Sequence, residues 1–166
     1  MSRNSARVVR DGIVSGVIGF ATVALFFIAT DAIAGRPLLY TPALLGGALF
    51  YGVTSPSEVT VSPAPVLAYT GTHLAVFVVI GTLAAGLAAL ASRHRHVWYL
   101  GVNLFLLVVA HASGAVLTLT ESLQGVVSAW LVTGATLAAA ITMALYLLWA
   151  NPPLLREMRD TEYQEP

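Results

Sequence analysis

Two histidines, His73 and His111, combine a reactive side chain with a position inside a long apolar stretch. With a rise of about 1.5 Å per helical residue, both lie about 10 to 12 Å from the same membrane surface. Facing histidines on neighbouring helices can ligate a haem iron from both sides, and a single histidine can ligate a chlorophyll-type pigment. Alternatively, a neutral histidine joins two helices by a hydrogen bond. We favour hydrogen bonding, and the bulk of Tyr69 and Leu107, four residues before each histidine, counts against the pigment.

Other groups with reactive potential are few. Asp31, near the end of the first apolar stretch, could pair with Arg36, be solvated, or join a polar cluster with the histidines and Glu121. A proton-coupled exporter needs a titratable group deep in the membrane, and no carboxylate lies near the middle of an apolar stretch. The chain has no cysteine, which excludes thiolate catalysis and thiolate metal sites. It also lacks a nucleophile–base pair or metal motif, so we expect no enzyme and no resident metal.

The composition predicts an all-α membrane protein. Of its 166 residues 57% are hydrophobic and only 10% are charged, against about 25% charged in a soluble domain. The net charge is zero, which gives no reason to expect nucleic acid as a partner. A transmembrane helix needs about 20 apolar residues, and four stretches qualify. They are residues 12–34, 66–91, 97–119 and 125–150.

The connections between these stretches predict the topology. Residues 92–96 and 120–124 are short connections, which place successive helices antiparallel, so residues 1–166 are expected to form one four-helix bundle. Seven of the eight arginines lie on one side of such a bundle, and only Arg36 lies on the other. The positive-inside rule therefore places both termini in the cytoplasm, and we expect a bacterial inner-membrane protein.

The outer segment, residues 35–65, is expected to contain a short interfacial helix. Thr41 and Pro42 resemble an N-cap and first helical residue, and Gly52 can end the helix in the left-handed conformation. This uncharged helix could cover its own bundle or dock another subunit. Small residues at helical spacing allow helices to pack closely. We expect most of them to pack within the chain, and the glycine face of the first span is the best candidate for a contact with another protein. The expected interface residues are Gly12, Gly16, Gly19, Tyr40, Leu44, Leu45, Leu49, Phe50 and Tyr51.

The segment GRPLLYTPALLG at residues 35–46, preceded by Asp31, carries a resemblance to known proteins. Together with Tyr69 and His73 it is similar to a group of uncharacterised bacterial four-helix integral membrane proteins. The resemblance covers residues 8–80, and the remainder is similar only in hydropathy. It implies a four-helix membrane fold and carries over no activity.

These observations predict a non-catalytic accessory or structural subunit of a larger integral-membrane complex. Photosynthetic or respiratory complexes are suggested by analogy alone. The expected partners are other integral-membrane subunits and lipid. Two alternatives remain: a b-type haem electron-transfer protein using His73 and His111, and a small channel or transporter.

Overall fold

The computed structural model describes residues 3–91 and 128–152, and all regular secondary structure within these ranges is helical. The third expected span, residues 97–119, and His111 lie outside the described residues. The described elements are α1 (Arg3–Ile33), α2 (Tyr40–Tyr51), the 3₁₀-helix η1 (Pro56–Glu58), α3 (Pro63–Ala91) and α5 (Ala129–Ala150).

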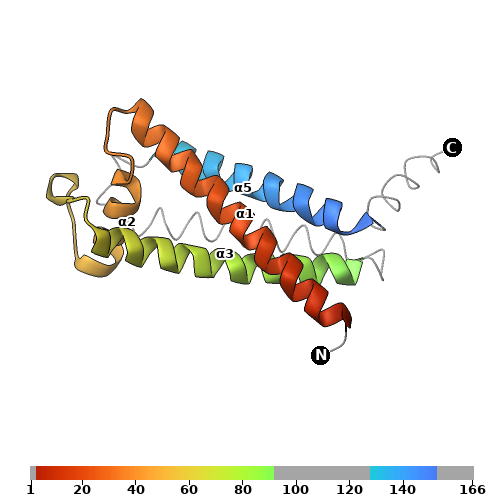
Figure 1. The fold of residues 1–166 in the computed structure, drawn as a ribbon. Coiled ribbons are helices and arrows are strands. Elements are labelled where there is room, and N and C mark those ends of the chain that lie inside the picture. The colour runs from red at the N-terminus through yellow and green to blue at the C-terminus, as the bar shows by residue number, and fades with distance from the viewer. Residues whose placement is uncertain (1–2, 92–127, 153–166) are drawn as a thin grey trace.

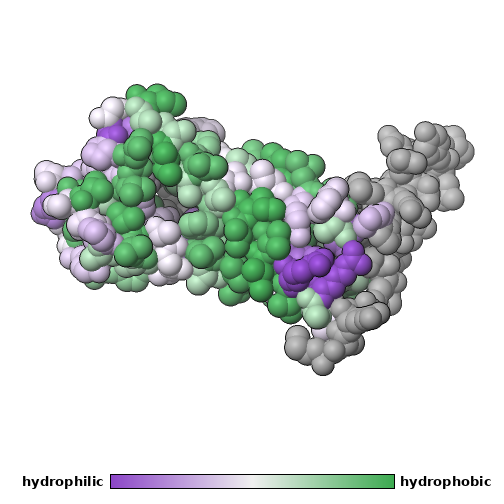
Figure 2. All heavy atoms as spheres, in the orientation of Figure 1, coloured by the Kyte–Doolittle hydropathy of each residue, from purple (hydrophilic) through white to green (hydrophobic). Residues whose placement is uncertain are grey.

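Three of these helices are long and apolar enough to cross a membrane. The qualifying stretches are Ser5–Ile33 in α1, Pro63–Leu90 in α3 and Trp130–Ala150 in α5. On the face that Figure 2 shows, apolar side chains cover much of the surface along the described helices, and strongly hydrophilic groups gather toward the two ends of the described part. This distribution indicates a membrane protein.

Helix α1 is the central element of the described chain. It crosses α3 and also lies against α5, whereas α3 and α5 make little contact with each other (Figure 1). The start of α1 lies at the same end of the molecule as the ends of α3 and α5 (Figure 1). Helix α1 therefore runs opposite to α3 and α5, and α2 lies at the far end, packed mainly on α3.

The contact between α1 and α3 depends on glycine. A Cβ atom added at Gly12 would lie 2.5 Å from Cα of Thr82, and one added at Gly81 would meet the backbone of Gly12 and Gly16. Lipid gives helices no hydrophobic drive to associate, so close backbone packing through small residues is a main source of their attraction. The three glycines permit that packing.

On its other side α1 packs against α5 and α2. The buried cluster consists of Val23, Phe27, Leu44, Val132, Ala135 and Ala139. The hydroxyl groups of Thr22 and Thr142 lie 3.0 Å apart and hydrogen-bond across the same interface. The buried residues of α5 recur every three or four positions, which is the spacing of one helical face.

The helix ends differ from the sequence prediction in ways that have local causes. Hydropathy marks only the apolar part of a helix, so α1 begins at Arg3, nine residues before the expected start of the span. Helix α3 begins at Pro63, where the missing N–H of proline costs nothing. Helix α2 begins at Tyr40 with Leu39 as its N-cap, because the side chain of Thr41 has another partner. Gly52 ends α2 in the left-handed conformation at φ 70°, as predicted.

Candidate functional site

The carboxylate of Asp31, in the last turn of α1, is fully buried and holds three segments together. Arg36 Nη2 lies 3.0 Å from Oδ1 of Asp31 as an ion pair. The hydroxyl of Thr41 donates to the same oxygen, and the Thr41 backbone N–H donates to Oδ2, both at 2.8 Å. Of the alternatives that the sequence left open for Asp31, the structure shows the pairing with Arg36.

This cluster positions the first turn of α2. A carboxylate that accepts an N–H from a helix's first turn satisfies an otherwise unpaired donor and interacts favourably with the helix dipole. The Arg36 guanidinium lies over the ring of Tyr40, with its Cζ 5.3 Å from the ring centroid. The Tyr40 hydroxyl in turn donates to the carbonyl of Pro56 at 3.4 Å. Both carboxylate oxygens of Asp31 have partners, so the role of this residue is structural: it joins the end of α1 to the start of α2.

His73 lies in α3 and is surrounded by aromatic rings. Tyr69 stacks on the imidazole with a centroid distance of 5.0 Å and an interplanar angle of 22°. The Phe77 ring lies at 4.9 Å, and Phe20 of α1 lies at 6.0 Å. Tyr69 therefore occupies a face of the imidazole, as its position four residues earlier suggested.

The Nε2 atom of His73 is buried and has no hydrogen-bond partner among the described residues. Buried polar atoms normally have a partner, so either a group outside these residues or a ligand would complete the site. His111, its expected companion, lies outside the described ranges, and the pairing of the two histidines stays a prediction. Within residues 3–91 and 128–152, no group of three or more metal-ligating His, Asp or Glu side chains comes together.

The expected interface residues fall into two sets. Gly12, Gly16 and Gly19 face α3 and α5 of the same chain, where the nearest groups include Thr82, Phe77 and Met143. These contacts lie within the chain, and an intermolecular contact on this face stays a prediction. Leu44 and Leu45 are also buried, and Tyr40 is half-buried beside Arg36, whereas Leu49, Phe50 and Tyr51 at the end of α2 are exposed.

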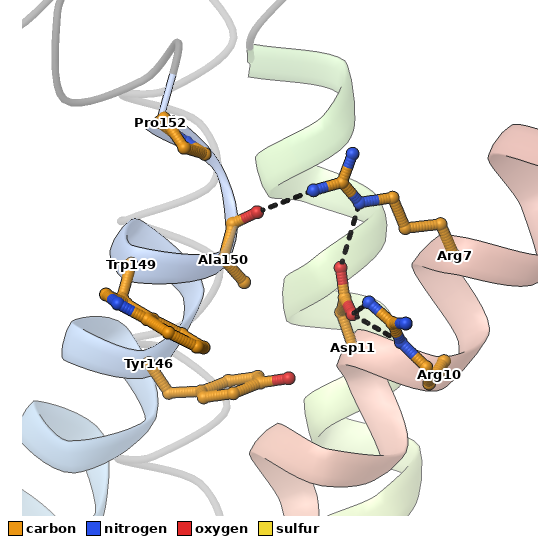
Figure 3. A pocket seen from close by; sticks show the side chains of 7 residues that line it. All are labelled: Arg7, Arg10, Asp11, Tyr146, Trp149, Ala150 and Pro152. Carbon is orange, nitrogen blue, oxygen red and sulfur yellow. Dashed lines mark hydrogen bonds and ion pairs between the residues drawn. The ribbon is translucent and has the colours of Figure 1, made fainter.

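A second carboxylate site, centred on Asp11, was not anticipated from the sequence. The Asp11 side chain is only 3% exposed and pairs with Arg10 Nη2 at 2.9 Å and with Arg7 Nε at 3.7 Å. Arg7 Nη2 also donates to the carbonyl oxygen of Ala150 at the end of α5, at 3.1 Å (Figure 3). The signal available in the sequence was the four-residue spacing of Arg7 and Asp11, which puts them on one helix face.

A cavity of about 240 Å³ opens beside this site (Figure 3). Arg7, Arg10 and Asp11 line it from α1, and Tyr146 and Trp149 line it from α5.

The chain itself matches no protein-family model, no curated protein and no solved structure.

Proposed function

We propose that this protein is a non-catalytic accessory subunit of a larger integral-membrane complex. The polar groups that the structure describes in and beside the spans support this role. Asp31 joins α1 to α2, Asp11 lies where Arg7 joins α1 to α5, and Thr22 hydrogen-bonds Thr142. All three arrangements hold helices in place.

The observation that carries the proposal is the apolar end of α2. Leu49, Phe50 and Tyr51, which we call the α2 end patch, are three successive large side chains, each more than two-fifths exposed. They lie between two membrane-capable helices rather than within one. Exposed apolar side chains grouped together often mark a protein interface. We assign this patch to contact with another membrane subunit, and the buried half of α2 to covering its own helices.

The proposed setting is a four-span antiparallel bundle in a bacterial inner membrane, with both termini in the cytoplasm. The arginine distribution supports this orientation. The common end of α1, α3 and α5 carries Arg7 and Arg10 and would face the cytoplasm, while α2 would lie at the outer surface. A photosynthetic or respiratory host complex belongs to the proposal by analogy only.

Site-specific photocrosslinking in the native membrane tests the role. A photoreactive phenylalanine analogue at position 50 should give a discrete adduct with another membrane protein. The matched control is position 83 in α3. The Leu83 side chain is 58% exposed, which is similar to the 49% exposure of Phe50. Leu83 lies within an apolar span, so an analogue there should react mainly with lipid. A chain that purifies as a lone monomer and gives no protein adduct at position 50 would contradict the proposal.

The partnerless Nε2 of His73 supports a second candidate, a b-type haem protein in which His73 is one ligand. A haem iron bound to Nε2 would give this buried nitrogen the partner that it lacks among the described residues, and the haem would supply one-electron transfer. Tyr69, Phe77 and Phe20 would hold the imidazole and exclude water. The absorption spectrum of protein expressed with haem available decides this candidate: a Soret band that is lost in His73→Leu supports it, and the absence of the band rejects it.

A further inference from the structure

The cavity between the start of α1 and the end of α5 carries an excess of positive charge. Arg7 and Arg10 supply two guanidinium groups, and Asp11 supplies one carboxylate. Each guanidinium has five N–H donors, while the hydrogen bonds and ion pairs described above use only some of the ten. The Arg10 side chain is 70% exposed. Summed over the described residues that line it, the cavity has one net positive charge, and it has guanidinium N–H groups beyond those that contact Asp11 and Ala150.

Aromatic side chains form the opposite wall. Trp149 is 76% exposed and lies next to Tyr146 on α5, with ring centroids 6.2 Å apart. Trp and Tyr gather at the headgroup level of membranes, because one part of each ring system is apolar and another is polar. The cavity lies at the common end of the membrane-capable helices, and in a bilayer that these helices cross, this end would lie at the level of the headgroups.

An apolar track leads away from the cavity along α1. Ile13, Val14 and Val17 follow Arg10 by three, four and seven residues, so they lie on the same side of the helix. All three side chains are exposed. The track extends about 10 Å from Arg10 along the helix axis. A ligand with a phosphate group and a hydrocarbon tail matches both the cavity and the track.

From this arrangement we propose that the cavity beside Arg10 and Trp149 binds the phosphate group of an anionic phospholipid. The guanidinium of Arg10 contacts the phosphate, Trp149 packs against the glycerol region, and an acyl chain follows the α1 track. Basic sites beside transmembrane helices on the cytoplasmic side bind anionic headgroups through the same chemistry. The site lies at the other end of the molecule from the α2 end patch and does not depend on the accessory-subunit role.

Native mass spectrometry of the full chain tests the proposal. The detergent-purified protein is given equal amounts of dioleoylphosphatidylglycerol and dioleoylphosphatidylcholine, and the ratio of the two bound lipids is measured. We expect a preference for phosphatidylglycerol that falls about fivefold in Arg10→Gln. Trp149→Ala, which leaves every charge in place, should also lower lipid retention. It keeps the test valid if Arg10→Gln does not fold.

The control is Thr60→Glu, which changes the net charge by the same amount at an exposed position in the other end region. It should leave the ratio unchanged. Inorganic phosphate, added without lipid, separates the two sources of a phosphate group, and we expect it to bind far more weakly. A ratio near one in the unmodified protein, an unchanged ratio and retention in both cavity variants, an equal loss in Thr60→Glu, or equally tight binding of inorganic phosphate would overturn the proposal.

Discussion

Asp31 shows how one buried carboxylate organises the end of the molecule that carries α2. A charge removed from water is tolerated only when it is paired and hydrogen-bonded. Arg36 supplies the countercharge, and Thr41 supplies both its backbone N–H and its hydroxyl. Because Arg36 follows Asp31 by five residues and Thr41 follows by ten, the chain must turn back sharply after α1. The carboxylate thereby fixes where α2 begins.

We expect Asp31→Asn to lower the free energy of unfolding by about 3 kcal/mol, since removing one member of a buried ion pair leaves the other without compensation. Arg36 is one quarter exposed, which places the effect at the low end of the range for such pairs. The measurement is denaturant unfolding in detergent, followed by circular dichroism.

The matched control for this change is Glu58→Gln. Glu58 is an exposed carboxylate that accepts the Thr54 N–H at 3.2 Å, so the same change from acid to amide should alter stability by less than about 0.5 kcal/mol. Equal effects at the two positions would show that the Asp31 charge does not stabilise the fold.

Part of the Asp31 site could be predicted from the sequence, and part could not. The pairing with Arg36 follows from proximity along the chain. The role of Thr41 does not, because the local pattern Thr-Pro predicts an N-cap, whereas the residue is recruited by a carboxylate ten positions earlier. The local rule fails here because Thr41 is buried, and the buried carboxylate of Asp31 takes both its N–H and its hydroxyl as hydrogen-bond donors.

At the scale of elements, the close approach of the α1 and α3 backbones is the main packing contact among the described helices. The sequence showed the glycines at helical spacing but could not show which surface they contact, since spacing alone is the same for internal and intermolecular packing. The structure places Gly81 of α3 directly against Gly12 and Gly16 of α1. The pairing of glycines on both helices, rather than one face alone, brings the two backbones together.

Gly81→Ala should lower the stability of the protein by about 1 to 3 kcal/mol, the usual cost of forcing extra volume into a packed interface. The added methyl group would meet backbone atoms, which cannot rotate away as a flexible side chain could. Thermal unfolding in detergent measures the effect.

Gly71→Ala is the control within the same helix. Gly71 is exposed, and a Cβ there meets nothing within 4 Å in the described part of the chain. This change should leave stability equal or raise it by up to about 1 kcal/mol, because alanine favours the helix. A Gly81→Ala variant as stable as Gly71→Ala would contradict the close contact.

At the scale of the whole molecule, hydropathy predicted three of the described helices because lipid imposes a length and an apolar composition on any helix that crosses it. It did not predict where α1 begins, since the polar turns before residue 12 carry no membrane signal yet continue the helix to Arg3. Those turns hold Arg7, Arg10 and Asp11, and so the cavity at that end was missed along with them. The polar extension joins α1 to the end of α5 through Arg7.

The orientation can be tested with single cysteines, because the chain contains none of its own. Ala6→Cys lies in the exposed first turns of α1, and Thr60→Cys lies in the exposed connection before α3. Arginine is retained on the cytoplasmic side, so a membrane-impermeant maleimide should label Thr60→Cys in intact spheroplasts and label Ala6→Cys only after the membrane is opened. Both variants should react fully in detergent, which controls for accessibility. The reverse pattern would contradict the assigned orientation, and labelling of both positions in intact spheroplasts would contradict a membrane crossing by α1.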